Sequence, residues 1–377
     1  MRTLILCHEY PPVGGGAGAV CAALGRGYVR AGHKATVVTM GFEGLDEREK
    51  IEGVEVHRIS CGRRRKDMAS PWEGLHWAWR CWPIARRLHA EHLFDVVHAH
   101  FIMPAGIVAR RLKRESGVPF IITPHGSDVP GYNRERLKLA HVLVRPWWRR
   151  ICKDADRITS PSASLLKLIE ARARHVKAEI IPNGFQPGRF RPLEKEKRIL
   201  LCSRLVERKG FHYFLEAIQD VNLPGWQVDL VGDGPMFERL ASMANRCKVP
   251  VHMHGWIDNH DPKLAELYGR AMIFVFPSEW ENFSIALLEA IGAGCAVITS
   301  DIAGNPEAIG NTGYLIKPKD VGAMRRATIA LTGDVERCLD LGRRASERAA
   351  AFFDWKIIAK RYIELLQSLV APNGGEQ

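Results

Sequence analysis

The sequence predicts an α/β protein built from two Rossmann-like domains, each with a parallel sheet. Short apolar runs typical of buried strands alternate with segments of helical periodicity along nearly all 377 residues. A second series of strands and helices begins at Ile199, after a charged run at residues 191–198. A chain of this length can hold two hydrophobic cores.

The domain boundary is expected near the sequence Ile-Pro-Asn-Gly at residues 181–184. We therefore expect a first domain over residues 1–183 and a second over residues 184–355. A terminal helix and tail occupy residues 356–377.

The segment 272–309 predicts one strand–helix–strand unit of a parallel sheet. Its helix is expected over residues 283–291, ended by two glycines. Glu289 lies inside this apolar helix, where an ionised carboxylate needs a partner or a ligand. Glu281 lies eight residues earlier, in the polar turn that leads into the helix.

This arrangement favours a nucleotide that carries a sugar. A helix N-terminus offers free N–H groups and a positive dipole end to phosphate, and a carboxylate can accept hydrogen bonds from two sugar hydroxyls. A second interpretation stays open, in which Glu281 caps the helix and Glu289 reaches solvent. If one helix held both carboxylates, they would lie ~12 Å apart along its axis, which does not suit a glycosidase pair across one bond.

Two cations flank the end of the strand expected over residues 199–203. Arg204 and Lys209 are placed to neutralise a diphosphate leaving group, and Arg208 could share the role. Two further loops follow strand ends in this half, at Gly232 and at Gly255 with Trp256 and Ile257.

The first half offers its own candidates. His125 opens a polar cluster after the strand at residues 121–124, and the carboxyl ends of parallel strands are where such sheets bind ligands. Gly14, Gly15 and Gly16 form a loop after the first strand, before a helix expected over residues 19–30. Since the second strand ends without an acidic residue, nicotinamide binding is disfavoured.

As a set, these motifs closely resemble the retaining glycosyltransferases of family 4, which have the GT-B fold. They occur in the family's order, from the glycine loop through His125, Arg204 and Lys209 to Glu281 and Glu289. The resemblance implies an acceptor-binding first domain and a nucleotide-sugar-binding second domain that face a cleft. It also implies that the terminal helix crosses back onto the first domain.

The resemblance implies transfer of a hexose, with retention, from a UDP- or GDP-sugar to a glycan or lipid-linked acceptor in cell-envelope polysaccharide or glycolipid synthesis. His125, Arg204, Lys209 and Glu281 would be catalytic. The donor-binding groups would be Glu289 at the ribose, the N–H groups of Phe283, Ser284 and Ile285, and the loops at Gly232, Gly255, Trp256 and Ile257. No cofactor and no metal are expected, because two cations take the metal's place.

Charge and tryptophan are concentrated in the first half. Residues 1–180 hold 30 Lys and Arg against 18 Asp and Glu, whereas the remainder holds 24 of each. Six of the ten tryptophans lie before residue 150, beside arginines. An anionic membrane surface would suit this composition, as would a set of core tryptophans with solvated arginines. The residues assigned to the membrane surface are Arg63, Arg64, Arg65, Lys66, Trp77, Trp79 and Trp82.

Other features exclude several classes. Nine scattered cysteines without a CxxC pair indicate reduced thiols, and no apolar run reaches the length of a signal peptide core or a membrane span. We therefore expect a cytoplasmic protein, peripheral on the inner face of the cytoplasmic membrane. His98 and His100 are interpreted as ordinary strand residues, the Asp154–Asp156 pair as no metal site, and nucleic acid as no partner.

Two alternative functions remain. A sugar-nucleotide epimerase can share this fold, and only an assay with and without an acceptor separates it from a transferase. A non-catalytic membrane-surface scaffold is the other alternative, although the presence of Glu281, Glu289, Arg204 and Lys209 argues against it.

Overall fold

The computed structural model describes residues 1–132, 138–174 and 176–370, with only the backbone described at 138–143. It divides the chain into two compact units. Unit 1 comprises Met1–Pro182 and Trp355–Gln377, and unit 2 comprises Asn183–Asp354. Both limits fall one residue before the positions expected from the sequence.

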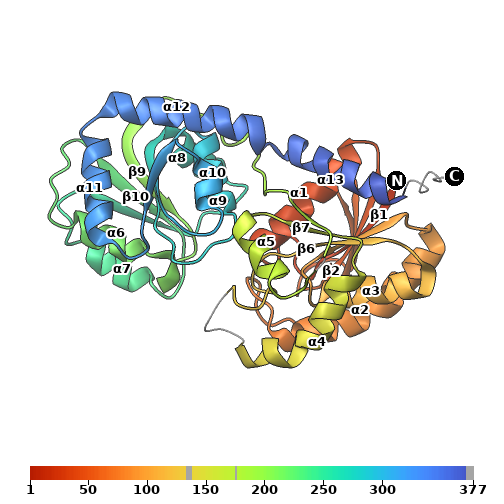
Figure 1. Cartoon of the computed structure of the whole chain (residues 1–377). Helices are drawn as coiled ribbons and strands as arrows, with labels where there is room; N and C mark the ends of the chain where they lie inside the picture. Colours follow the sequence, from red (N-terminus) through yellow and green to blue (C-terminus); the bar gives the residue numbers. More distant parts are fainter. Residues whose placement is uncertain (133–137, 175, 371–377) are drawn as a thin grey trace. The chain divides into compact units, whose positions relative to one another are not determined.

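Unit 1 is an eight-stranded sheet with helices on both faces (Figure 1). Its strands run in the order β3-β4-β2-β1-β5-β6-β7-β8, and all pairs are parallel except β3 with β4. Its elements are β1 (Arg2–Leu6), α1 (Gly16–Arg30), β2 (Lys34–Met40), β3 (Arg48–Ile51), β4 (Val54–Ile59), α2 (Pro71–His92), β5 (Val96–His100), α3 (Ala105–Ser116), β6 (Phe120–Thr123), α4 (Lys138–Asp154), β7 (Arg157–Ser160), α5 (Ala163–Glu170), β8 (Ala178–Ile180) and α13 (Trp355–Val370).

The faces of this sheet bury different helices. One face packs α2, α3, α4 and α5 around a core that includes Trp77 and Trp148. The other face carries α1 and α13, which lie side by side (Figure 1). On that side, Tyr362 of α13 places its hydroxyl 3.2 Å from Thr123 Oγ1 of β6. The terminal helix is therefore part of unit 1.

Unit 2 is a six-stranded parallel sheet in the order β11-β10-β9-β12-β13-β14. Its elements are β9 (Glu196–Cys202), the 3₁₀ turn η1 (Glu207–Lys209), α6 (Phe211–Ile218), β10 (Gln227–Val231), α7 (Phe237–Ala244), β11 (Val251–Gly255), α8 (Pro262–Arg270), β12 (Ala271–Phe276), α9 (Ile285–Gly292), β13 (Ala296–Ser300), α10 (Asn305–Ile309), β14 (Gly313–Ile316), α11 (Val321–Thr332) and α12 (Val335–Phe352).

The centre of this sheet is buried on both faces. Every residue of β12 and of β13 is buried, which explains the continuous apolar run of β12 and the apolar start of β13. Helices α6, α7 and α11 cover one face and α8 and α9 the other, while α12 contributes to both cores. The predicted fold class is therefore confirmed in each unit.

Two helices begin at other residues than the sequence predicted. Helix α1 begins at Gly16 rather than residue 19, because Gly16, Ala17 and Gly18 already form its first turn. Helix α9 begins at Ile285 rather than residue 283, since Phe283 and Ser284 still belong to the turn. Such shifts of one to three residues are usual where a polar turn enters an apolar helix.

Candidate active site

The carboxyl ends of β9, β10, β11 and β12 bring together the residues predicted to bind the donor. Arg204 follows β9, Gly232 follows β10, Trp256 follows β11, and Glu281 follows β12. In a parallel sheet all of these ends lie along one edge. Unit 2 therefore carries a polar edge made of loops from four strands.

Lys209 and Glu281 form the centre of this edge. The Nζ atom of Lys209 makes an ion pair with Glu281 Oε1, and only 11% and 14% of the two side chains are exposed. Ser278 Oγ donates to the same carboxylate oxygen at 2.9 Å. Burial lowers the pKa of the Lys209 ammonium, and Glu281 opposes that change. These two of the four predicted catalytic residues thus neutralise each other's charge.

Close approach of two loops creates this pair. Gly210, directly after Lys209, has a φ of +71°, and a Cβ there would lie 2.2 Å from the carbonyl oxygen of Pro277. Only glycine permits this approach of η1 to the β12–α9 turn. The backbone N–H of Glu279 also donates to Arg208 O at 2.8 Å, which ties the same two segments together.

Arg204 and Arg208 add positive charge to the same place. Both lower the pKa of Lys209 through their own charges, after the larger effect of burial. Arg204 is exposed, whereas Arg208 is half-buried. Three cations therefore converge beside one carboxylate, an arrangement suited to an anionic ligand with several oxygens.

The N-terminus of α9 lies beside this cluster. Leu288 N makes the first helical bond to Ser284 O at 3.2 Å, so the N–H groups of Ile285, Ala286 and Leu287 precede the helical ladder. The sequence predicted these free donors at residues 283–285. Because the helix begins two residues later than predicted, they are at residues 285–287 instead. Asn183 fixes the turn, because its Nδ2 donates to Phe283 O at 2.7 Å.

Glu289 sits one turn inside α9. It is half-buried, and burial raises the pKa of its carboxyl to about 8, which the charge of Arg189 partly offsets. No hydrogen bond or ion pair joins its side chain to a residue that the structure describes. A carboxyl group without a protein partner in such a place is a candidate for binding a ligand.

The remaining predicted loops lie at the adjoining strand ends. Gly232 has a φ of +139°, and a Cβ would lie 1.9 Å from Ser203 O, so this loop packs directly against the one that carries Arg204. Gly255 ends β11 with a φ of +67°. Trp256 is 60% exposed, whereas Ile257 is buried in the core.

Unit 1 has a second polar cluster, around His125 at the end of β6. His125 Nε2 lies 3.0 Å from His100 Nδ1 of β5, and Phe101 packs against the His125 ring at 4.8 Å. Burial lowers the pKa of His125 to about 3, helped by His8. At neutral pH this side chain is therefore an uncharged imidazole.

Asp128 holds the backbone of this cluster. Its carboxylate accepts from the N–H groups of Ile102 (2.6 Å), His125 (3.0 Å) and Gly126 (3.1 Å). Burial raises the pKa of Asp128 to about 6 against these bonds. The loops after β5 and β6 are thus joined by one buried side chain.

The glycine loop lies at the end of β1 and opens α1. Gly15 N donates to Glu9 Oε2 at 3.0 Å, and Gly14 N donates to Lys66 O at 2.8 Å. A Cβ at Gly15 or Gly16 would meet nothing within 4 Å. The first turn of α1 carries no acidic residue of its own, but the Glu9 carboxylate from the preceding loop already accepts from the N–H of the N-cap residue, Gly15.

Part of the predicted membrane surface is wrong. Trp77 is fully buried in the core of unit 1, because it lies on the inner side of α2. Arg63 is also buried, and its guanidinium donates to the carbonyl oxygens of His8, Arg65 and Lys66. Trp82 is half-buried, with Arg111 4.2 Å above its ring.

The other predicted surface residues are exposed. Trp79 is 74% exposed, and Arg64, Arg65 and Lys66 lie at the surface in the preceding loop. Trp72, which was not assigned a role, is 80% exposed and lies seven residues before Trp79, on the same side of α2. We call these five residues the aromatic–basic face.

His98 and the aspartate pair have partners of their own within unit 1. His98 lies inside the sheet, between Tyr28 OH (3.0 Å) and Thr123 Oγ1 (2.8 Å). Asp154 and Asp156 pair with Arg110 and Lys113. The residues that the structure describes contain no group of three His, Cys, Asp or Glu side chains able to hold a metal. Within them, no helix is long and apolar enough to cross a membrane.

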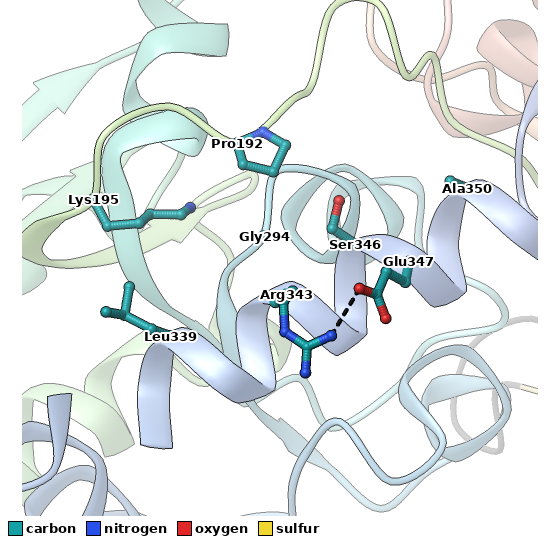
Figure 2. A pocket seen from close by; sticks show the side chains of 8 residues that line it. All are labelled: Pro192, Lys195, Gly294, Leu339, Arg343, Ser346, Glu347 and Ala350. Carbon is teal, nitrogen blue, oxygen red and sulfur yellow. Dashed lines mark hydrogen bonds and ion pairs between the residues drawn. The ribbon is translucent and has the colours of Figure 1, made fainter. Parts of the chain in front are cut away.

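A hollow of about 420 Å³ lies at the opposite edge of unit 2, near the starts of β9 and β13 (Figure 2). It is lined by Pro192, Lys195, Gly294, Leu339, Arg343, Ser346, Glu347 and Ala350. Lys195 donates to the carbonyl oxygens of Ala271 and Ala293, both at 2.7 Å, and Arg343 pairs with Glu347. None of the predicted site residues lines it.

The sequence missed His100 and Asn183 as parts of the site. His100 was dismissed as a strand residue, although a histidine at the carboxyl end of a central strand is itself a signal. Asn183 was read as linker only. Its role depends on a contact one hundred residues away, which spacing cannot reveal.

Fold and site together define a glycosyltransferase of the GT-B type, and the comparisons with known proteins agree. Residues 14–189 match the family described as Glycosyltransferase Family 4, and residues 196–334 match Glycosyl transferases group 1. The chain therefore belongs to the glycosyltransferases that join a family 4 domain to a group 1 domain.

Curated relatives cover nearly the whole chain. A glycogen synthase of Mycobacterium tuberculosis is 29% identical over 100% of this chain and 96% of its own length. A GDP-mannose-dependent α-(1-6)-phosphatidylinositol monomannoside mannosyltransferase of the same organism is 25% identical over 97% of this chain and 98% of its own.

Solved structures share the fold. Sucrose-phosphate synthase from Thermosynechococcus elongatus matches with a TM-score of 0.85 and 22% identity, covering 98% of this chain and 100% of that one. The Anabaena protein HepE, in complex with UDP and glucose, matches with a TM-score of 0.76 and 18% identity over 98% and 100%.

Proposed function

We propose that the protein transfers a hexose from a UDP- or GDP-sugar, with retention at the anomeric carbon, to a glycan or lipid-linked acceptor in cell-envelope polysaccharide or glycolipid synthesis. The observation that carries this proposal is the edge of unit 2. There Arg204 and Arg208 lie near Lys209, which pairs with Glu281 in the turn that leads into α9, and Glu289 of α9 has a carboxyl group without a described protein partner.

The cations would stabilise the leaving group. As the bond from the anomeric carbon to the diphosphate breaks, negative charge develops on the phosphate oxygens. Arg204, Lys209 and the first N–H groups of α9 are donors of the kind that stabilise such charge. On this proposal they supply the charge that a metal ion supplies elsewhere, so no cofactor is required.

Glu281 would serve the sugar rather than attack it. Its carboxylate already accepts from Lys209 and Ser278, which lowers its nucleophilicity and holds it in place. We propose that the acceptor hydroxyl attacks from the face that the diphosphate leaves, and that its proton passes to a phosphate oxygen. The new bond then forms with retention and without a covalent enzyme intermediate.

Glu289 would bind the ribose. Its ionised form can accept from both the 2′- and 3′-hydroxyls, and no residue that the structure describes competes for it by a hydrogen bond or ion pair. The exposed Trp256 and the backbone around Gly255 would border the base. A uracil or a guanine is the leading choice, because the mannosyltransferase relative depends on GDP-mannose and HepE holds UDP.

The acceptor would be bound by unit 1. We propose that a sugar hydroxyl contacts His125 and that the acceptor approaches the glycine loop. The aromatic–basic face favours a lipid-linked acceptor at an anionic membrane surface, since exposed tryptophans and cations are typical of interfacial helices. The backbone N–H of Arg64 donates a hydrogen bond to the side-chain Oε1 of Glu73 (2.9 Å), which holds the basic loop beside the first turn of α2.

A donor panel tests the reaction. Purified protein would be incubated with UDP- and GDP-hexoses, with and without an extract of lipid-linked acceptors, and the anomeric configuration of the product read by NMR. Acceptor-dependent release of the nucleoside diphosphate with an α-linked product from an α-donor supports the proposal. Conversion of the sugar nucleotide without acceptor would identify an epimerase, and an inverted linkage would contradict retention.

Vesicle co-sedimentation tests the membrane part separately. With vesicles that contain anionic lipid, replacing Trp72 and Trp79 by Ala should weaken binding, as should replacing Arg64, Arg65 and Lys66 by Ser. Substitution of the exposed Trp256 by Ala, in unit 2, is the matched control and should leave vesicle binding unchanged. Equal binding by all variants would remove the membrane from the proposal.

A further inference from the structure

A row of imidazoles runs through the sheet of unit 1 to His125. The rings of His98 and His100, both fully buried on β5, stack with centroids 4.3 Å apart. The rings of His100 and His125 lie 11° from parallel with centroids 5.3 Å apart, and their nitrogens are 3.0 Å apart. The last pair therefore has the geometry of an in-plane hydrogen bond.

All three rings are uncharged at neutral pH. Burial lowers the pKa of His98 and of His125 to about 3, and it lowers the pKa of His100 well below its usual range. A hydrogen bond between two neutral imidazoles contains one proton. One ring must donate an N–H and the other must accept with a lone pair.

The other nitrogen of His100 decides which ring donates. His100 Nε2 is buried and has no hydrogen-bond partner. If it carried the proton, a buried N–H would be orphaned, which is rarer and costlier than an unpaired buried acceptor. The proton of His100 is therefore on Nδ1, and this N–H donates to His125 Nε2.

We propose that His100 is a positioning residue that fixes the tautomer and the plane of His125. With Nε2 of His125 occupied as an acceptor, the His125 proton lies on Nδ1, which bonds to no residue that the structure describes. His125 thus presents a neutral N–H donor to its ligand. Asp128 and Phe101 complete the support, since one holds the His125 backbone and the other packs on its ring.

The consequence for catalysis rests on the proposed function. A sugar or acceptor oxygen would accept from His125 Nδ1–H, so His125 would orient a hydroxyl and would not remove its proton. The tautomer itself does not depend on any substrate. Its test therefore stays valid if the proposed reaction is wrong.

The direct experiment is NMR of the full chain labelled with ¹⁵N-histidine, at pH 7 and without ligands. The signals of His125 would be assigned by their loss in His125→Gln. We expect His125 to show a protonated Nδ1 and an unprotonated Nε2. A protonated Nε2 on His125 would overturn the proposal at once, and no other variant is needed for that outcome.

Two substitutions of His100 then test the positioning role. His100→Phe keeps an aromatic ring in the stack but removes the donor, so His125 should shift toward the Nε2–H tautomer. His100→Asn keeps a short-range donor and should retain the Nδ1–H form. With the identified donor and acceptor, we expect His100→Phe to lower kcat roughly three- to tenfold and His100→Asn to restore most of it.

His98→Phe is the matched control. His98 is as buried as His100 and stacks on it, but it bonds Tyr28 and Thr123 instead of His125. It should lower thermal stability without changing the His125 tautomer. The same tautomer of His125 in the wild-type protein and in folded His100→Phe would show that His100 does not set it.

Discussion

The carboxyl-end edges of the two sheets differ in their electrostatics. In unit 2, three cations, two glutamates and a helix N-terminus gather at the strand ends. In unit 1, the equivalent edge holds neutral imidazoles and one buried aspartate. Yet residues 1–180 carry the whole net charge of +12, and the remainder is neutral. The net charge of a domain is therefore a poor guide to the charge at its site.

The difference follows from what each edge is proposed to bind. A departing diphosphate needs fixed positive charge, whereas a sugar or acceptor hydroxyl needs only oriented hydrogen bonds. Substitutions in the two units should accordingly fail in different ways. Those in unit 2 should affect nucleotide binding and the departure of the leaving group. Those in unit 1 should affect turnover or acceptor binding and leave nucleotide binding unchanged.

Lys209→Met should have the largest effect. It removes a charge from the diphosphate and leaves Glu281 as a buried, unpaired carboxylate. We expect kcat/KM to fall by about 10²- to 10³-fold and the free energy of unfolding to fall by about 3–5 kcal/mol. Steady-state kinetics and urea denaturation would measure the two effects.

The double variant Lys209→Met with Glu281→Gln is its control. It should recover much of the lost stability, since neither charge is then left unpaired, but it should recover no activity. Recovery of activity would show that the lysine is needed only to neutralise the charge of Glu281.

The pH dependence of nucleotide binding should show the next largest effect. Because the Glu289 pKa is raised to about 8, the folded, unliganded protein keeps this proton at neutral pH, and ionisation weakens the folded state as pH rises through 8. If ribose binds the ionised form, affinity should rise by up to about tenfold per pH unit below 8 and level off above it.

Glu289→Gln removes the titrating group. Its nucleotide affinity should be low and almost constant between pH 6 and 9, as titrated by calorimetry. A rising affinity in this variant, parallel to that of the wild type, would assign the titration to another group.

His125→Ala should have a smaller and purely kinetic effect. Losing one hydrogen bond to a neutral hydroxyl predicts a decrease in kcat of about tenfold. The Kd for the nucleoside diphosphate, which unit 2 would bind, should stay unchanged. A comparable loss of nucleotide affinity would break the contrast drawn between the two units.

Removing the exposed tryptophans should have the smallest effect on the fold. The double variant with Trp72→Ala and Trp79→Ala should change the free energy of unfolding by about 0.5 kcal/mol or less. Any loss of activity in it should therefore depend on the form of the acceptor. We expect a soluble acceptor analogue to be used at the wild-type rate and an acceptor in vesicles more slowly.

Most of the fold could be predicted from regular patterns of apolar residues in the sequence. Continuous apolar runs such as β12 predicted parallel sheets, because a strand that is buried on both faces contains few polar residues. The second series of strands and helices, which begins at Ile199, predicted that there are two such sheets. Arg204, Lys209, Glu281 and the Gly232 loop could be placed at one edge for the same reason. Which of them touch could not be predicted. The Lys209–Glu281 pair depends on how closely Gly210 lets two loops approach.

The tryptophans show what the sequence could not predict. Trp77 and Trp79 are two residues apart on one helix, in the same arginine-rich context, yet one is in the core and the other at the surface. Composition treats them alike, and only the direction of each side chain around α2 separates them. His100 was missed for a related reason, since its partner His125 lies in the loop after the neighbouring strand β6.

The central claim is that unit 2 binds a nucleoside diphosphate through Glu289 and the cation cluster. Calorimetry of UDP, GDP, ADP and CMP against the wild type and Glu289→Ala tests it most directly. We predict that either UDP or GDP binds clearly, more tightly than CMP, and that the variant weakens that binding. If no nucleotide binds, or if Glu289→Ala binds as well as the wild type, the assignment of this site to the donor is wrong.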